Sequence, residues 1–319
     1  MKNKTAIVFP GQGSQVVGMG KDLYENFASA KKVFQKIDDI LSLNLSKLMF
    51  EGPIEELTKT ENTQPALMAV SVALVEVLEQ DFGKKFADLC AFTAGHSLGE
   101  YSALCASKAL TLEDTAKLLQ IRGNEMAKCG QKNAGAMCAV LGVEISVAHE
   151  IAQEAQAQSP QGSVCQVAND NSVGQVVLSG SKIAIEKAVE IAKAKGAKRA
   201  LLLPVSGAFH SSLMAEAQQK MAIALADVNI QQPSVGVVAN VSAQIIQNSS
   251  EIKDLLAKQI TGSVRWRETM LCFEQNGVED IIELGAGKVL SGLVTRTCPN
   301  IKGRSIQNSE ELKNFIATI

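Results

Sequence analysis

The sequence reads Gly95-His96-Ser97-Leu98-Gly99 between the apolar run 89–92 and the helix-forming stretch 100–105. A serine between two glycines, after a strand and before a helix, is typical of the sharp turn that presents a nucleophile. The glycines permit the turn, and the helix directs free N–H groups toward the point where negative charge develops. Because any turn rich in glycine and serine can match five positions, a purely structural turn stays open here.

The composition is that of an ordinary globular protein. With 319 residues, of which 46% are hydrophobic and 20% charged, the chain can bury a large core, and we expect about two domains. The net charge of −2 gives no reason to expect binding to nucleic acid or to an anionic membrane. Because no apolar span reaches membrane length and the first residues do not read as a secretory signal, we expect a cytoplasmic protein.

The cysteines do not predict a metal site or a disulfide framework. Their number is odd, and no two of them form a C-x-x-C pair or stand near a histidine at metal-binding spacing. We therefore expect no metal, and we interpret these thiols as reduced and mostly buried. The seven are Cys90, Cys105, Cys129, Cys138, Cys165, Cys272 and Cys298.

Two hydrophobic patterns divide the chain. From residue 5 to about 127, and again from about 205 to the end, short apolar runs alternate with amphipathic segments, which indicates an α/β layer fold. Examples of the apolar runs are 5–9, 64–78, 89–94, 235–240 and 278–284.

The middle of the chain follows a different order, strand-helix-strand-strand-helix-strand. This order is typical of a ferredoxin-like unit, so we predict a small inserted domain over 129–204 within a discontinuous α/β core of 1–128 and 205–319. The predicted strands are 136–141, 164–168, 175–178 and 199–203, the helices are 144–156 and 183–195, and a turn is expected at 169–174.

A serine nucleophile needs a base, and the chain has three histidines. His96 adjoins Ser97, where a sharp turn would send the two side chains apart, so we expect a packed residue of the turn. His149 lies in a polar helical stretch and is expected on the surface. By elimination His210 is the candidate base, on a loop between a strand-like run and a helix. A lone loop histidine is often structural, and its pairing with Ser97 is what favours catalysis.

Arg122 lies on the buried side of a predicted helix over 111–129, whose start fits a capping box formed by Thr111 and Asp114. A buried guanidinium is costly without an anionic partner. Either a neighbouring Asp or Glu pairs with it, or the arginine binds the carboxylate of a substrate through bidentate bonds.

The first strand ends in the glycine-rich stretch Phe9-Pro10-Gly11-Gln12-Gly13-Ser14-Gln15. Val16 stands where a dinucleotide-binding turn needs its third glycine, and the stretch lacks the Lys and Ser/Thr of a P-loop. We interpret the backbone N–H of Gln12 as one half of an oxyanion hole, with Leu98 as the other half. The glycines of 285–288 are interpreted as a packing turn.

Taken in order, five blocks of this sequence resemble the malonyl-CoA:acyl carrier protein transacylase family. The set spans nearly the whole chain and is far more specific than the serine turn alone. The blocks are Phe9 to Gln15, Gly95-His96-Ser97-Leu98-Gly99-Glu100, Arg122-Gly123, Gly207-Ala208-Phe209-His210-Ser211 and Gly262-Ser263-Val264-Arg265-Trp266.

The resemblance implies a hydrolase-like α/β core with a ferredoxin-like insert, in agreement with the boundaries above. In this family main-chain carbonyls orient the histidine, so no Asp or Glu has to complete a triad. The resemblance further implies the following roles: Ser97 is the acylated nucleophile, His210 the base, and Arg122 the binder of the malonyl carboxylate. The backbone N–H groups of Gln12 and Leu98 form the oxyanion hole, and Gln259 lies near His210. Phe209 is expected to shape the acyl pocket, and Asn169 to line the cleft.

The resemblance also implies the substrates. Malonyl-CoA would be the donor and the phosphopantetheine thiol of acyl carrier protein the acceptor, with no separate cofactor, in fatty acid biosynthesis; polyketide synthesis stays open. We expect a monomer. The basic residues Lys193, Lys195, Lys198 and Arg199 either contact the acidic carrier protein or are ordinary residues of a helix end and strand start.

Two functions other than acyl transfer remain as alternatives, a serine hydrolase and a carrier-protein-binding module. A serine hydrolase usually orders its residues Ser, acid, His and can carry an HGGG-type loop, and neither pattern is found here. A module that binds carrier protein without turnover does not need Ser97, His210 and Arg122 together.

Overall fold

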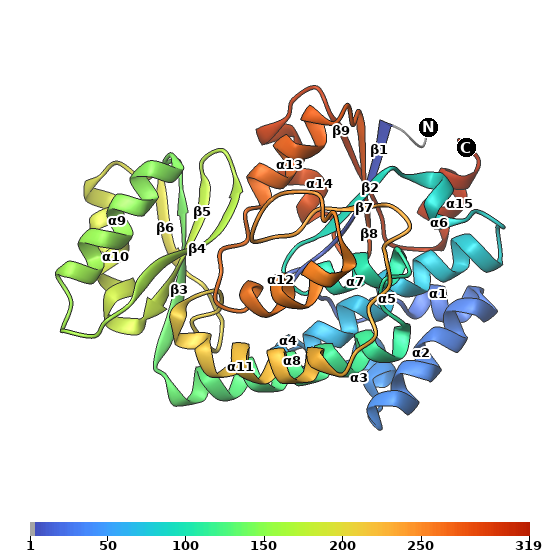
Figure 1. Cartoon of the computed structure of the whole chain (residues 1–319), viewed down its shortest axis with the longest axis horizontal. Coiled ribbons are helices and arrows are strands. Elements are labelled where there is room, and N and C mark those ends of the chain that lie inside the picture. Colours follow the sequence, from blue (N-terminus) through green and yellow to red (C-terminus); the bar gives the residue numbers. More distant parts are fainter. Residues whose placement is uncertain (1–3) are drawn as a thin grey trace.

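The computed structural model describes residues 4–319, which form a mixed α/β protein with two separate sheets (Figure 1). The larger sheet has five parallel strands in the order β7-β2-β1-β8-β9, and the smaller has four antiparallel strands in the order β4-β5-β3-β6. The strands are β1 Thr5–Phe9, β2 Phe92–Gly95, β3 Gly135–Leu141, β4 Cys165–Ser172, β5 Gln175–Ser181, β6 Arg199–Leu202, β7 Gly236–Val237, β8 Asp280–Leu284 and β9 Lys302–Ile306.

Most of the helices belong to the larger unit, whereas α9 and α10 pack on the smaller sheet, which forms one end of the molecule (Figure 1). The helices are α1 Lys21–Asn26, α2 Ala28–Leu41, α3 Leu45–Glu51, α4 Ile54–Thr58, α5 Thr60–Gln80, α6 Phe86–Leu89, α7 Gly99–Ala106, α8 Leu112–Lys132, α9 Ile145–Ala157, α10 Lys182–Ala194, α11 Ala215–Ala226, α12 Ile252–Gln259, α13 Trp266–Gln275, α14 Val289–Thr297 and α15 Ser309–Ile316.

The parallel sheet is the centre of the core. Every residue of β1 is buried, as expected for a strand covered by helices on both faces. The long apolar run 64–78 lies within α5, which is buried on nearly all sides and contacts α2, α7 and α8. α8 begins as predicted, because the Thr111 hydroxyl accepts a hydrogen bond of 3.0 Å from the backbone N–H of Asp114.

The middle segment has the predicted order of elements, but its predicted turn at 169–174 is too long. β4 continues to Ser172, with irregular register on either side of Asn169 and Asp170, so only 173–174 connect it to β5. The polar residues stay in strand conformation because β4 also pairs with the larger unit. The Asp170 N–H donates to the Val264 carbonyl at 3.0 Å, and the Val264 N–H donates to Ala168 at 2.8 Å.

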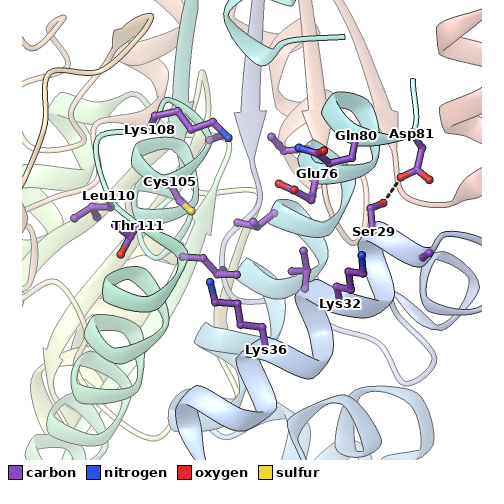
Figure 2. A pocket seen from close by; sticks show the side chains of 16 residues that line it. Ser29, Lys32, Lys36, Glu76, Gln80, Asp81, Cys105, Lys108, Leu110 and Thr111 are labelled. Atoms are coloured by element: carbon purple, nitrogen blue, oxygen red, sulfur yellow. Dashed lines mark hydrogen bonds between the residues drawn. The ribbon is translucent and has the colours of Figure 1, made fainter. Parts of the chain in front are cut away.

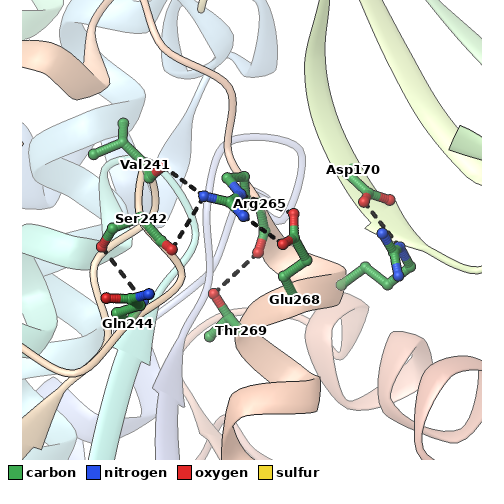
Figure 3. A network of polar contacts seen from close by, with 8 residues as sticks. Asp170, Val241, Ser242, Gln244, Arg265, Glu268 and Thr269 are labelled. Carbon is green, nitrogen blue, oxygen red and sulfur yellow. Dashed lines mark hydrogen bonds and ion pairs between the residues drawn. The ribbon is translucent and has the colours of Figure 1, made fainter. Parts of the chain in front are cut away.

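Charged side chains strengthen this connection between the two units (Figure 3). Arg267 of α13 forms an ion pair of 2.8 Å with Asp170, whose carboxylate is buried. Arg265 pairs with Glu268 and donates to the main-chain carbonyls of Val241 and Ser242. The Arg267–Asp170 pair holds β4 against α13, whereas the contacts of Arg265 join α13 to the loop 241–242 within the larger unit.

The sequence predicted no membrane-spanning segment and mostly buried cysteines. Within residues 4–319, no helix is both long and apolar enough to cross a membrane. Six of the seven cysteines are buried, and Cys272 is partly exposed.

Candidate active site

The Ser97 turn stands at the carboxyl ends of the two central strands. β1 and β2 are paired so that Phe9 lies opposite Gly95, and α7 begins at Gly99. Ser97 has a φ of 54°, in the left-handed region that non-glycine residues rarely adopt. A Cβ atom on Gly95 would lie 1.9 Å from the Gly99 carbonyl, so the close approach of strand and helix requires glycine. The local sequence therefore forms the predicted strand-turn-helix.

His210 meets Ser97 although 113 positions separate them. The Ser97 Oγ lies 2.8 Å from His210 Nε2, while His210 Nδ1 lies 2.8 Å from the Gln259 carbonyl and 3.2 Å from the Gly262 carbonyl. Because a carbonyl only accepts, Nδ1 carries the proton and Nε2 is free to accept one from Ser97. His210 also has a positive φ, of 58°.

The imidazole of His210 is neutral at physiological pH. Burial, and after it the charge of the nearby Arg122 guanidinium, lower the pKa of His210 to about 3, although the hydrogen bonds to the two carbonyls act in the opposite direction. A neutral imidazole can take the Ser97 proton without first losing one of its own.

Arg122 of α8 is 1% exposed and lies directly beside the serine. Its Nη2 donates to Ser97 Oγ at 2.9 Å and to Gln259 Oε1 at 2.8 Å, and its Nη1 donates to Gln64 Oε1 at 2.7 Å. These partners are uncharged, unlike the Asp or Glu of the structural alternative. Burial lowers the pKa of Arg122, and its Nε has no hydrogen-bond partner within 4–319. The site thus holds a buried cation with unused capacity for an anion.

Two backbone N–H groups beside Ser97 are candidates for the oxyanion hole. Gln12 and Leu98 both line the cavity at Ser97, and neither N–H has a hydrogen-bond partner within the described residues. The Gln12 side chain is held by the Thr60 hydroxyl, which donates to its Oε1 at 3.0 Å. Free donors fixed beside a nucleophile are what an oxyanion hole requires.

These groups line a cavity of about 240 Å³ between the two sheets. Phe209 and Asn169 line it, as predicted, whereas Gln259 is fully buried behind it and meets the site through Arg122 and His210. The lining residues are Gln12, Gln64, His96, Ser97, Leu98, Arg122, Met126, Met137, Ala139, Asn169, Asn171, Gln175, Val177, Leu203, Val205, Phe209 and His210.

A larger cavity of about 540 Å³ lies elsewhere, beside α2 and α5 (Figure 2). Its labelled side chains mix lysines, such as Lys32 and Lys36, with the acidic Glu76 and Asp81. No histidine is among its described lining residues, and burial raises the pKa of the Cys105 thiol to about 11. This cavity therefore lacks a serine–histidine pair among its described lining residues, and the smaller cavity is the candidate active site.

Of the other two histidines, His149 is exposed on α9, as predicted. The prediction for His96 was only partly right. Its ring packs on Trp266 with centroids 5.6 Å apart, but it also lines the Ser97 cavity and lies 2.9 Å from Asn171 Oδ1. The extended β4 explains the difference, because it brings Asn171 to the cavity wall.

Four further polar residues at the site were not predicted from the sequence: Gln64, Asn171, Glu100 and Asn240. For Gln64 a signal existed, since it is a polar side chain at the start of the apolar run 64–78. Glu100 ends the block that contains Ser97. Asn240 and Asn171 carry no local signal, because only tertiary pairing brings them to the site.

The fold and the site define an α/β protein with a serine–histidine pair and a buried arginine at the carboxyl edge of a parallel sheet, an arrangement suited to acyl transfer. A model of the acyl transferase domain family matches residues 6–308. The malonyl CoA-acyl carrier protein transacylase of Bacillus subtilis (strain 168) is 42% identical over 317 residues, which cover 99% of this chain and 98% of that one. The one of Escherichia coli (strain K12) is 41% identical over 291 residues, 91% and 92% of the two chains.

Solved structures agree with this assignment. An acyl-carrier-protein-S-malonyltransferase from Bartonella henselae has a TM-score of 0.94 and 47% identity over 100% of this chain and 99% of its own. A malonyl-transacylase solved in complex with a type II PKS acyl-carrier protein has a TM-score of 0.93 and 37% identity over 99% and 100%. The chain belongs to the malonyl CoA-acyl carrier protein transacylase family and is an acyltransferase.

Proposed function

We propose that this protein transfers a malonyl group from malonyl-CoA to the phosphopantetheine thiol of acyl carrier protein through a malonyl ester of Ser97. The observation that carries the proposal is the double contact of one atom: Ser97 Oγ is 2.8 Å from the base His210 and 2.9 Å from the Arg122 guanidinium. A buried cation beside the nucleophile suits an acyl group that itself carries a carboxylate.

In the first half-reaction, Ser97 Oγ attacks the thioester carbonyl and its proton passes to His210 Nε2. The N–H groups of Gln12 and Leu98 stabilise the oxyanion of the tetrahedral intermediate, and Arg122 binds the malonyl carboxylate. The C–S bond then breaks, and the CoA sulfur leaves as the thiol with the proton from His210. The base contributes roughly 10²–10⁴-fold and each oxyanion donor about 10²–10³-fold.

The second half-reaction reverses these steps with another thiol. The phosphopantetheine S–H gives its proton to His210, its sulfur attacks the ester carbonyl, and the C–Oγ bond breaks as Ser97 recovers a proton. The result is ping-pong kinetics with no cofactor, because CoA enters only as part of the substrate. The apolar side chains in the cavity, Phe209 among them, limit the access of water to the ester.

We also propose that the larger unit is a hydrolase-like core of 1–128 and 205–319, and that 129–204 is a ferredoxin-like insert. The order β3-α9-β4-β5-α10-β6 and the antiparallel arrangement β4-β5-β3-β6 support the second assignment. α8 crosses the proposed boundary and ends at Lys132, so it links the units as a continuous helix.

The setting proposed for this activity is a cytoplasmic monomer in fatty acid biosynthesis. The names of the curated relatives support acyl carrier protein as the acceptor. For docking on the carrier protein, Lys195 is less available than the sequence implies, because it pairs with Glu150 and Glu154 at 3.3 and 3.4 Å.

Intact mass measured after a brief exposure to malonyl-CoA tests the proposal. We expect a malonyl adduct on the wild-type protein that disappears when carrier protein with a phosphopantetheine thiol is added. Ser97→Ala should form no adduct, whereas Ser102→Ala, which alters a buried serine of the helix α7 that follows the Ser97 turn, should form it normally. Release of free malonate at the same rate without carrier protein would identify a hydrolase, and a wild-type protein without any adduct would be a binding module.

A further inference from the structure

Behind the site lies a buried carboxylate that the mechanism above does not use. Glu100 is the second residue of α7 and is 1% exposed. A carboxylate is costly to bury unless donors satisfy it. Its Oε2 accepts two hydrogen bonds, from Gln259 Nε2 at 2.6 Å and from the backbone N–H of Asn240 at 3.1 Å. Both donors belong to residues that contact the reacting groups.

Gln259 connects Glu100 to the base and to the arginine. Its main-chain carbonyl accepts from His210 Nδ1, its Oε1 accepts from Arg122 Nη2, and its Nε2 donates to the main-chain carbonyl of Ser97 at 3.0 Å. The acceptor oxygen Oε2 of Glu100 and the donor Arg122 together fix the Gln259 amide with its nitrogen toward Oε2 and its oxygen toward the guanidinium. The orientation of one amide thus decides where the guanidinium is held.

Asn240 connects Glu100 to the serine turn. Its Oδ1 accepts from the Ser97 N–H at 2.8 Å, and its Nδ2 donates to the Gly95 carbonyl at 2.8 Å. These two bonds hold the turn at its strained residue and at the residue two positions before it. The backbone of Asn240 is held by Glu100 on one side and by Arg265 on the other, whose N–H donates to the Asn240 carbonyl at 3.0 Å. Figure 3 shows Arg265 reaching the next two residues of the same loop.

We propose that Glu100 is a positioning residue of the acyltransfer reaction: through Gln259 and Asn240 it aligns Ser97, His210 and Arg122 with one another. The inference rests on the proposed acylation of Ser97. Glu100 acts through other residues, since none of its hydrogen bonds within the described chain reaches Ser97 Oγ, His210 or Arg122 directly.

Asn240 and Gln259 donate to the same oxygen of Glu100, Oε2. Substitutions can therefore test the role of this acceptor oxygen separately from the role of the negative charge. A glutamine at position 100 can place its amide oxygen where Oε2 stands and keep both bonds. An alanine removes the acceptor, and an aspartate keeps the charge but withdraws the carboxylate by one methylene group. Burial raises the pKa of Glu100 to about 7, although its hydrogen bonds and the charge of Arg122 act in the opposite direction.

The test measures the rate of malonyl-Ser97 formation in a single turnover, together with kcat and KM, for Glu100→Ala, Glu100→Asp and Glu100→Gln. We expect alanine and aspartate to lower the rate constant by about 10–100-fold, because displacements of about 1 Å cost up to 10²-fold. KM for malonyl-CoA should change by less than about 3-fold, since misalignment affects mainly the chemical step. Glutamine should keep the rate within about 5-fold of the wild type.

Glu283 provides a matched control. It is a fully buried glutamate at the end of β8 that accepts from the backbone N–H groups of Leu290 and Ser291, at 3.1 and 2.7 Å. Glu283→Ala should therefore lower thermal stability, as Glu100→Ala does, while the folded protein keeps its acylation rate. If Glu100→Ala does not fold, the acylation rate of Glu100→Asp decides whether Glu100 has the positioning role.

The outcomes are distinguishable. A wild-type protein that forms no adduct would refute the acylation of Ser97 itself. If the wild type forms the adduct and the alanine or aspartate variant acylates equally fast, the positioning role is wrong. Equal losses in Glu283→Ala, or a glutamine variant as slow as alanine, would also overturn it, because the effect would then come from general stability or from the charge.

Discussion

The two sheets contribute to the cavity in different ways. On the side of the parallel sheet, Ser97 follows β2 and Arg122 comes from α8, while His210 lies on the loop between β6 and α11; the backbone of Ser97 and His210 is held at positive φ. The antiparallel sheet forms a wall of polar and apolar side chains, such as Asn171 and Met137, and three of the four residues of β6 are exposed. Positive-φ backbone thus occurs at the serine and at the histidine, whereas the antiparallel sheet contributes side chains of the cavity wall.

This contrast separates two kinds of mutational effect. Changes around the parallel sheet should act on the chemical step, because they move groups that must meet within hydrogen-bond distance. Changes on the antiparallel wall should act on binding, since those side chains contact the substrate without transferring protons. The predictions below test this separation, from the largest expected effect to the smallest.

Removal of the base should have the largest effect. His210→Ala is expected to lower the acylation rate of Ser97 by about 10²–10⁴-fold, because no other group within residues 4–319 that could accept a proton forms a hydrogen bond with Ser97 Oγ. Stopped-time mass spectrometry of the adduct measures this rate. His149→Ala, which alters an exposed histidine on α9, is the control and should leave the rate unchanged. If the acylation rate of His210→Ala were within 3-fold of the wild-type rate, His210 would not be the base for the acylation of Ser97.

Replacement of Arg122 should reduce the transfer of malonyl groups more than the transfer of acetyl groups. Each charge-assisted bond to the malonyl carboxylate is worth about 1.5–3 kcal/mol, so Arg122→Ala should lower kcat/KM for malonyl-CoA relative to acetyl-CoA by at least roughly 10-fold. Arg122→Lys should recover only part of the difference, because an ammonium group lacks the planar fork. Equal losses for both donors would mean that the arginine serves only to hold Gln64 and Gln259.

The pH dependence of stability tests the buried carboxyl group of the parallel-sheet region. Burial raises the pKa of Glu100 from 4.5 to about 7, so its contribution to folding is complete below pH 4.5 and is lost as the pH rises through 7. Between pH 5 and pH 8 the wild type should therefore lose about 2 kcal/mol of unfolding free energy relative to Glu100→Gln. Urea unfolding of both proteins at each pH measures the difference, and parallel stability curves would contradict it.

The sequence predicted the parts of the site that depend on local structure. Ser97, Gln12 and Leu98 stand next to strands or helices whose patterns are strong, and Arg122 is marked by its place on an apolar helix face. His210 was found by elimination among three histidines. The relation of the base to Gln259 came from the family resemblance, because a contact through a main-chain carbonyl leaves no trace in residue type.

The sequence did not predict features created by pairing between distant segments. β4 continues through Asn169 to Ser172 because it hydrogen-bonds to Val264, and nothing in the polar stretch 169–172 indicates this partner. The same pairing brings Asn171 to His96, which explains why His96 lines the cavity. Glu100 and Asn240 escaped notice for a related reason, since their role depends on a hydrogen bond between residues 140 positions apart.

The smallest effect is expected on the antiparallel wall. Asn171→Ala removes the oxygen 2.9 Å from His96 Nε2, and a net hydrogen bond is worth about 0.5–1.5 kcal/mol. KM for malonyl-CoA should therefore rise by about 2–10-fold while kcat stays within about 2-fold, because His96 lines the cavity but does not contact Ser97 Oγ or His210 Nε2 through a hydrogen bond within 4–319. Gln158→Ala, at the exposed end of α9 in the same unit, is the control and should change neither constant. A fall in kcat as large as that of His210→Ala would show that the wall takes part in the chemical step, and the division of labour between the two sheets would not hold.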